Sequence, residues 1–128
     1  AENPILMVFG HHMRNGTMFS DLMKYRDDLF WDNHRTIQFD TLYERGEYEI
    51  FAAGYAPSAS EAEQYMRFYS FTGGSGYQEY IQLLKEEALY ETGIWPEGAP
   101  LLLLITCSYQ EIDGRFFVAG YLSEEYMA

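Results

Sequence analysis

The stretch Leu-Leu-Leu-Leu-Ile-Thr-Cys, residues 101–107, decides the fold of this chain. A continuous apolar run of this length is typical of a strand that is covered on both faces. Asp113-Gly114 is a turn signal, and a second apolar segment begins directly after it at Arg115. The two segments therefore predict an antiparallel hairpin, and if they flank one turn, Cys107 lies opposite Arg115.

Turn signals divide the rest of the chain into short segments with strand or helix patterns. Further strands are predicted at residues 5–10, 36–42, 47–53 and 115–122, with a turn at 44–46. Helices are predicted within 17–33 and over 75–92, where Ser75 and Gln78 form a capping box, whereas 61–71 fits either structure. Because strands outnumber helices, we expect a mostly β fold in a single domain over residues 1–128, an antiparallel barrel or sandwich with helical insertions.

Composition argues against several classes of protein and of site. The 128 residues carry a formal net charge of −12, which argues against binding to nucleic acid or to an anionic membrane. Cys107 is the single cysteine, so the sequence predicts no intramolecular disulfide and no cysteine-rich zinc site. No apolar run approaches the roughly 18 residues of a membrane span, and no signal peptide is recognised. The first strand has almost no lead-in, so we expect a fragment of a larger domain or a chain that borrows strands from a partner.

Three residues at predicted strand ends could perform chemistry. Cys107 lies where an apolar strand meets a polar loop, and its thiol is either an inert buried group or a nucleophile. Arg115 is either a solvated edge charge or a guanidinium that favours the thiolate and stabilises an oxyanion. His11 follows the first strand and could relay protons to the thiol. It is adjacent to His12, but no third ligand lies at a useful spacing, so no metal site is predicted.

The segment from Phe9 to Leu22, FGHHMRNGTMFSDL, closely resembles the segment around the catalytic histidine in class B sortases. Residues 106–109, TCSY, and 114–116, GRF, resemble two further elements of the same family. The order histidine, cysteine, arginine is also the sortase order, and the resemblance covers roughly Ile5 to Ala119. Phe9 stands where family members usually have tyrosine, and Ile105 where they have serine.

The resemblance implies a sortase-like β-barrel whose N-terminal strands are missing from this chain, and a cysteine transpeptidase of the Gram-positive cell surface. By the same motifs, Cys107 is the expected nucleophile, His11 the general acid and base, and Arg115 the group that holds the substrate carbonyl or oxyanion. Residues 75–92 are the expected helix that class B members insert in a long loop. The resemblance further implies substrate contacts from Phe9, Tyr65, Met66, Thr106 and Ser108.

The expected partners follow from the same resemblance. The substrate is the sorting signal of a surface protein, of the N-P-x-T-x kind, and the acceptor is an amino group of a peptidoglycan precursor or a pilin. We expect no cofactor, the extracellular face of the cell membrane as location, and a strand-exchanged homodimer as one way to replace the missing strands. Two alternatives stay open: a non-catalytic peptide-binding or assembly module with the same fold, and a thiol hydrolase that releases peptides to water.

Overall fold

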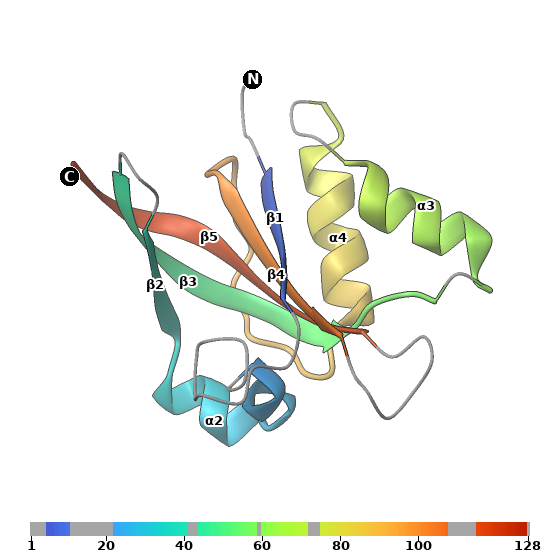
Figure 1. Cartoon of the computed structure of the whole chain (residues 1–128), viewed down its shortest axis with the longest axis horizontal. Coiled ribbons are helices and arrows are strands. Elements are labelled where there is room, and N and C mark those ends of the chain that lie inside the picture. The colour runs from blue at the N-terminus through green and yellow to red at the C-terminus, as the bar shows by residue number, and fades with distance from the viewer. Residues whose placement is uncertain are drawn as a thin grey trace.

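A curved sheet of five strands forms the centre of the part of the chain that the structure describes (Figure 1). The computed structural model describes residues 5–10, 22–40, 44–58, 60–71, 75–107 and 115–127, and of residues 40, 44, 45, 107 and 124–127 it describes only the backbone. The elements in chain order are β1 (Ile5–Gly10), the 3₁₀ helix η1 (Leu22–Arg26), α2 (Asp28–Asn33), β2 (Thr36–Asp40), β3 (Glu44–Tyr55), α3 (Ala62–Ser70), α4 (Tyr77–Glu87), β4 (Leu101–Cys107) and β5 (Arg115–Met127).

β4 and β5 form the hairpin that the apolar run predicts. The two strands pair antiparallel, and Cys107 lies directly opposite Arg115. This register confirms the pairing expected from the sequence. Residues 108–114, which contain the predicted Asp113-Gly114 turn, lie outside the described part of the chain.

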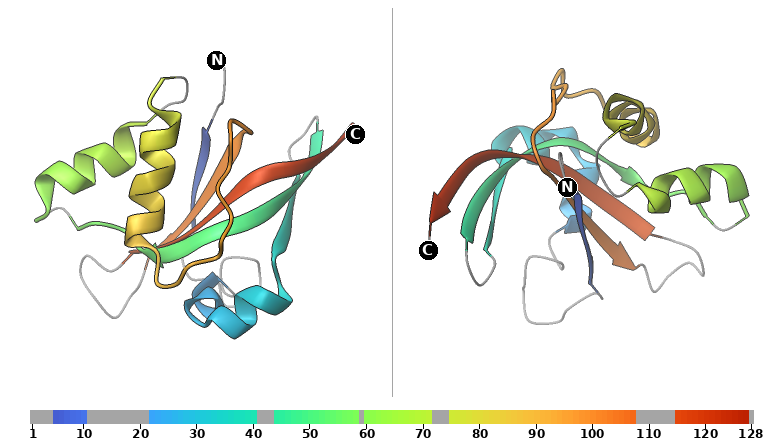
Figure 2. Two further views of the ribbon diagram at one scale, coloured as in Figure 1. Left: turned by 180° about the vertical axis from the view of Figure 1, so that it is seen from behind. Right: turned by 90° about the horizontal axis from the view of Figure 1, so that it is seen from above.

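The other strands extend this hairpin into a sheet of order β1-β4-β5-β3-β2. β3 pairs antiparallel with both β5 and β2, whereas β1 pairs parallel with β4. Register shifts between Glu47 and Tyr48 and between Ile50 and Ala52 interrupt the pairing of β3 with β5, and irregularities of this kind bend a sheet. The sheet curls into a half-barrel (Figure 2). The expected mostly β, barrel-like fold with helical insertions is thus confirmed.

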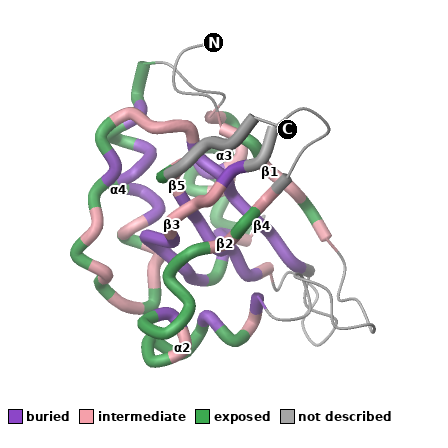
Figure 3. Tube along the Cα trace, turned by 90° about the vertical axis from the view of Figure 1, so that its left-hand side faces the viewer, coloured by how far each residue is buried: buried purple, intermediate pink, exposed green. Residues whose placement is uncertain are grey.

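Side chains of β4 and β5 point alternately to the two faces of the sheet, and each face borders its own hydrophobic core. The first core lies toward α3 and α4 and contains the odd-numbered residues Leu101, Leu103, Ile105, Phe117 and Ala119. The second core lies toward η1 and α2 and contains the even-numbered residues Leu102, Leu104, Phe116 and Val118. Because both faces of these strands are covered, the middle of the sheet is buried (Figure 3). The prediction that the run at 101–107 is covered on both faces holds through residue 106.

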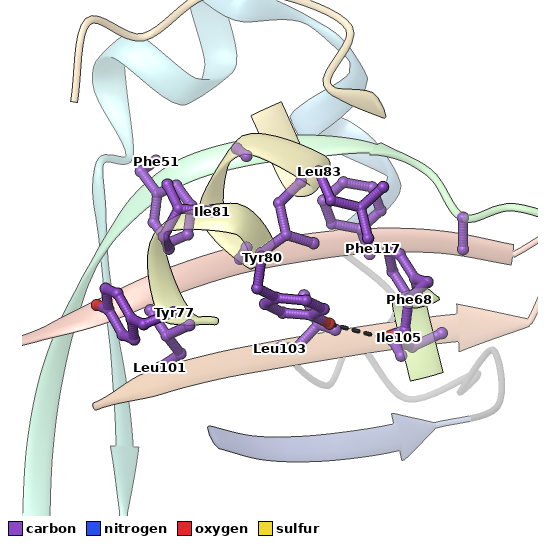
Figure 4. Close-up of a cluster of buried hydrophobic side chains, with 14 residues drawn as sticks. Phe51, Phe68, Tyr77, Tyr80, Ile81, Leu83, Leu101, Leu103, Ile105 and Phe117 are labelled. Carbon is purple, nitrogen blue, oxygen red and sulfur yellow. Dashed lines mark hydrogen bonds between the residues drawn. The ribbon is translucent and has the colours of Figure 1, made fainter. Parts of the chain in front are cut away.

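Helix α4 closes the first core with one apolar face (Figure 4). Tyr77, Tyr80 and Ile81 recur at helical spacing, and all three are buried. The Tyr80 hydroxyl donates to the Phe68 carbonyl of α3 at 2.8 Å, and the Tyr77 hydroxyl donates to the Ala99 carbonyl at 2.7 Å. These contacts confirm the amphipathic helix that the spacing predicts.

The N-terminal end of α4 differs from the prediction. The N-cap is Gly76, with a left-handed φ of 89° and no side-chain cap hydrogen bond, so the predicted capping box of Ser75 and Gln78 is wrong. The side chain of Gln78 is engaged elsewhere, because it accepts from the Trp95 indole and donates to the Pro96 carbonyl. A tertiary contact has therefore replaced the local cap.

The C-terminal end of α4 comes at Glu87, five residues before the predicted end near Thr92. Ala88 has an extended backbone and forms an isolated bridge with Gly54 of β3. The Thr92 hydroxyl donates to the Phe51 carbonyl of the same strand at 2.7 Å. The segment after the helix is therefore bound to the sheet and cannot continue the helix.

The turn predicted at residues 44–46 is wrong. These residues belong to β3, and Gly46 pairs with Phe39 of β2. A Cβ at Gly46 would lie 2.9 Å from the Tyr48 ring and 3.1 Å from the Leu122 side chain, so glycine serves a close approach within a strand here. β3 and β5 are also longer than predicted.

Helix α3 occupies most of residues 61–71, the segment whose sequence fits either a helix or a strand. Tyr65, Phe68 and Tyr69 recur at helical spacing, and Phe68 is fully buried in the first core. The short helices predicted within 17–33 are η1 and α2 in the described part of that segment.

β1 is a strand, as predicted, but it is not covered on both faces. It lies at an edge of the described sheet. Leu6 is 41% exposed and Phe9 is 54% exposed. An apolar run therefore indicates a strand here without indicating how completely it is buried.

Candidate active site

The ends of three strands meet at one place in the sheet. β4 lies between β1 and β5, with Gly10 beside Thr106 on one edge and Arg115 opposite Cys107 on the other. The backbone of Cys107 is therefore flanked by the start of β5 and by the end of β1. His11 follows Gly10 directly in the sequence and lies outside the described residues.

Arg115 is held by a tyrosine of α3. Its Nη1 donates to the Tyr69 hydroxyl at 3.3 Å, and its Cζ lies 5.7 Å from the centroid of the Tyr69 ring. The hydrogen bond with Tyr69 raises the pKa of Arg115 above its ordinary value, and Tyr65 acts in the same direction. Burial lowers this pKa by a smaller amount. Arg115 is thus a charged, partly buried side chain with aromatic partners, and not the solvated edge charge that the sequence left open.

Tyr65 and Tyr69 lie at this guanidinium and Phe9 packs on Tyr69, and we call Phe9, Tyr65 and Tyr69 the aromatic cluster. The ring of Phe9 stacks on that of Tyr69, with centroids 6.2 Å apart and an interplanar angle of 20°. Tyr65 and Tyr69 lie one turn apart on α3, with ring centroids 4.7 Å apart. Because Phe9 is half-exposed and Tyr65 partly exposed, the cluster presents accessible aromatic surface beside Arg115.

Two other predicted substrate contacts lie apart from this cluster. Met66 is 61% exposed, and its side chain leaves α3 roughly 100° around the helix axis from that of Tyr65. Thr106 is buried, and it alternates with Ile105, which places it on the face of the second core. The structure thus brings Tyr65 to Arg115 and Phe9 to Tyr69, and it does not bring Thr106 to the same face.

The structure describes the remaining predicted site residues only in part. His11 and Ser108 lie outside the described residues, and Cys107 is described through its backbone. Within the described ranges, no three His, Cys, Asp or Glu side chains are grouped so that they could hold a metal ion. No helix among those ranges has the length and apolar character that crossing a membrane requires.

Tyr69 is the residue of this cluster that the sequence did not single out. Its contact with Arg115 depends on how α3 packs on the sheet, which periodicity does not reveal. The available signal was the spacing of Tyr65 and Tyr69, which share a face only if the segment is helical.

Known proteins resemble this chain in sequence and in fold. No family model matches the sequence. The chain is 27% identical over 119 residues to sortase B of Listeria monocytogenes, which covers 91% of this chain and 47% of that protein. It is 25% identical over 117 residues to sortase B of Staphylococcus aureus, with 89% and 46% covered. The chain is similar in sequence to sortase B along nearly its whole length. It spans about half the length of the curated sortase B relatives it matches.

Solved sortase B structures have the same fold. Sortase B of Clostridium perfringens gives a TM-score of 0.76 at 20% identity, over 97% of this chain and 67% of that one, and this likeness concerns the fold alone. Sortase B of Listeria monocytogenes gives a TM-score of 0.74 at 27% identity, over 94% of this chain and 65% of that one. The resemblance to class B sortases that the motifs indicate is therefore confirmed.

Proposed function

We propose that this chain carries the active site of a class B sortase, a cysteine transpeptidase that cleaves the sorting signals of surface proteins and joins them to an amine. In this proposal residues 1–128 are one domain, which corresponds to the C-terminal part of a sortase catalytic domain. The observation that carries the proposal is the pairing of Cys107 with Arg115. Homology to sortase B supports it independently.

Each proposed role has a physical reason. Directly opposed residues of an antiparallel pair share one face of a sheet, and a cation near a thiol favours the nucleophilic thiolate. Cys107 is therefore assigned as nucleophile and Arg115 as the group that holds the substrate oxygen. His11 is assigned as the general acid and base, because Gly10 and Thr106 are paired and the residues that follow them in the sequence are His11 and Cys107.

In the first half-reaction, the Cys107 sulfur attacks the threonine carbonyl carbon of an N-P-x-T-x signal. The carbonyl π electrons move to oxygen, and the Arg115 guanidinium stabilises the negative charge that develops there. When this intermediate collapses, the peptide C–N bond breaks and a thioester forms. The leaving amine takes a proton from the His11 imidazolium.

In the second half-reaction, the amino group of a peptidoglycan precursor or a pilin attacks the thioester. The amine gives a proton to the neutral His11 imidazole, the C–S bond breaks, and the thiolate is regenerated. The product is a new amide, and the sequence of steps consumes no redox equivalent. Water in place of the amine would give the product of a thiol hydrolase.

Substrate contacts are assigned to the surface around Arg115. The accessible rings of Phe9 and Tyr65 support direct contact with the signal peptide. Met66 and Ser108 are kept as further contacts on the strength of the motifs. Thr106 is assigned to support the end of β4 beneath the substrate and not to contact the substrate directly, since its side chain is buried and lies toward the second core. The proposed location is the extracellular face of the membrane, where such signals and acceptors meet.

The first test uses a sorting-signal peptide as substrate and triglycine as acceptor, because one solved sortase B structure is a complex with triglycine. We expect Cys107→Ala to abolish cleavage and Arg115→Ala to lower kcat roughly 10²-fold or more, the scale of one lost oxyanion contact. Mass spectrometry of the products is expected to detect the peptide–triglycine amide. Tyr121→Phe removes a hydroxyl from β5 that bonds to Glu49, and is the matched control with unchanged kcat.

Different outcomes separate the alternatives. Turnover by Cys107→Ala would remove Cys107 as nucleophile and contradict the proposal. Cleavage that yields only the hydrolysed peptide at saturating triglycine would identify a thiol hydrolase. Peptide binding without cleavage, together with slow alkylation of the single cysteine near neutral pH, would identify a non-catalytic module.

A further inference from the structure

We propose that Tyr69 is a positioning residue for Arg115: it fixes the guanidinium at the start of β5, opposite Cys107. The motifs do not assign this role to any residue. The inference rests on the proposed function, because the placement of Arg115 matters only if Arg115 holds the substrate oxygen.

Tyr69 is itself firmly anchored. Its neighbour Phe68 is fully buried, and the two rings meet at 4.8 Å between centroids and an angle of 66°. Phe68 also contacts the ring of Phe117 at 5.3 Å, and Phe117 lies two residues after Arg115 on the same face of β5. Helix α3 is thus fastened to β5 directly beside Arg115, so the Tyr69 hydroxyl has a defined position relative to the guanidinium.

Tyr69 also contacts the strand on the other side of β4. The ring of Phe9, two residues before His11 in the sequence, stacks on the Tyr69 ring. One side chain of α3 therefore touches the end of β1 and the start of β5, the two strands that flank Cys107. A residue in this place can fix the relative position of both flanking strands.

A tyrosine hydroxyl suits this task chemically. An arginine side chain has many rotamers, and a partner that selects one of them removes an entropic cost that the substrate would otherwise meet. A neutral hydroxyl accepts a hydrogen bond without cancelling the positive charge, as a carboxylate would. The guanidinium has five N–H donors, so after the bond to Tyr69 it retains donors for a carbonyl oxygen.

The test is a double-mutant cycle with Tyr69→Phe and Arg115→Ala. Tyr69→Phe keeps the ring that contacts Phe9 and removes only the hydroxyl. We expect it to lower kcat about fivefold, the scale of one hydrogen bond, with KM changed less than about twofold. In the Arg115→Ala background, we expect the same substitution to leave kcat unchanged. Tyr121→Phe serves as the hydroxyl-deletion control and is expected to be silent in both backgrounds.

A second readout does not require turnover. The alkylation rate of Cys107 by iodoacetamide, followed against pH, reports the thiolate, and Cys107 is the single cysteine. We expect Tyr69→Phe to shift this pH profile upward, as Arg115→Ala does, and to have no further effect in the Arg115→Ala protein. Thermal unfolding of each variant verifies that the fold is kept.

The outcomes separate the positioning role of Tyr69 from the proposed function. Equal effects of Tyr69→Phe in both backgrounds, or no effect in the parent, would overturn the role of Tyr69 while leaving the proposed function intact. Cleavage that stays at the parent rate in both the Cys107→Ala and the Arg115→Ala variant would overturn the proposed function itself.

Discussion

Tyr25 connects three segments of the chain through one side chain and its backbone. Its hydroxyl donates to the His34 carbonyl at 2.6 Å, and its carbonyl accepts from the Tyr90 hydroxyl at 2.7 Å. Burial raises the pKa of Tyr25 to about 12. The hydrogen bond with Glu49 raises the pKa of Tyr121 to about 12 as well. Both phenols therefore stay neutral in the folded protein well above the ordinary value of about 10.

These shifts predict loss of stability in alkaline solution. A pKa that is higher in the folded than in the unfolded state gives stability that is fully present below about pH 10 and is lost as the pH rises through about 12. We expect the free energy of unfolding, measured in urea, to fall across this window. Tyr25→Phe is expected to cost about 1 kcal/mol near neutral pH, the value of one hydrogen bond, and to make the alkaline decline shallower. A decline of unchanged slope in this variant would contradict the assignment.

Single residues differ in how far the sequence reveals their role. The opposition of Cys107 and Arg115 could be predicted, because the register of a hairpin follows from residue numbers once both strands are recognised. The role of Tyr69 could not, because it depends on the packing of α3 against β5. Thr106 matches its motif, yet the pleat of β4 directs it to the second core.

At the scale of elements, the close approach of α4 to β3 decides where the helix ends. A Cβ at Gly54 would lie 2.2 Å from the Glu87 carbonyl oxygen and 3.1 Å from the Cα of Ala88. Both neighbours are backbone atoms, so neither can move aside without shifting the helix end. The bounds of α4 therefore could not be predicted from its own residues, although its apolar face could.

Gly54→Ala is accordingly expected to destabilise the protein by about 1–3 kcal/mol, the cost of overpacking a well-filled contact. Gln82→Ala, at an exposed position of α4, is the control and is expected to stay within about 0.5 kcal/mol of the parent. Denaturant unfolding with a common slope measures both. If Gly54→Ala unfolds at the same denaturant concentration as Gln82→Ala, α4 does not approach β3 this closely in solution.

At the scale of the whole molecule, the net charge of −12 opposes the compact state through self-repulsion. Salt weakens this repulsion, since the Debye length falls from about 30 Å at about 0.01 M to about 3 Å at about 1 M. We therefore expect Tm to rise as potassium chloride is added over this range. Glu79→Gln combined with Glu86→Gln, two exposed positions of α4, is expected to reduce the rise. A Tm that falls or stays constant would show that charge repulsion does not limit stability.

The sequence predicts the overall architecture of the sheet better than it predicts which strands are neighbours. Apolar runs and turn signals indicate the strands, and the motifs indicate the sortase B fold that the comparisons confirm. The parallel placement of β1 at the edge of the described sheet could not be derived from periodicity, because an apolar run carries no information about its neighbour.

The pairing of β1 with β4 brings Ile5 beside Leu101, so most of the chain lies between two contacting residues. The β4–β5 hairpin closes a far shorter loop, and contacts close in sequence form faster than remote ones. We therefore expect β1 to dock late during folding, when Cys107 and Arg115 are already paired. Under the proposed function, His11 follows this late-docking strand directly in the sequence, so the general acid and base is the last of the three assigned residues to join the site.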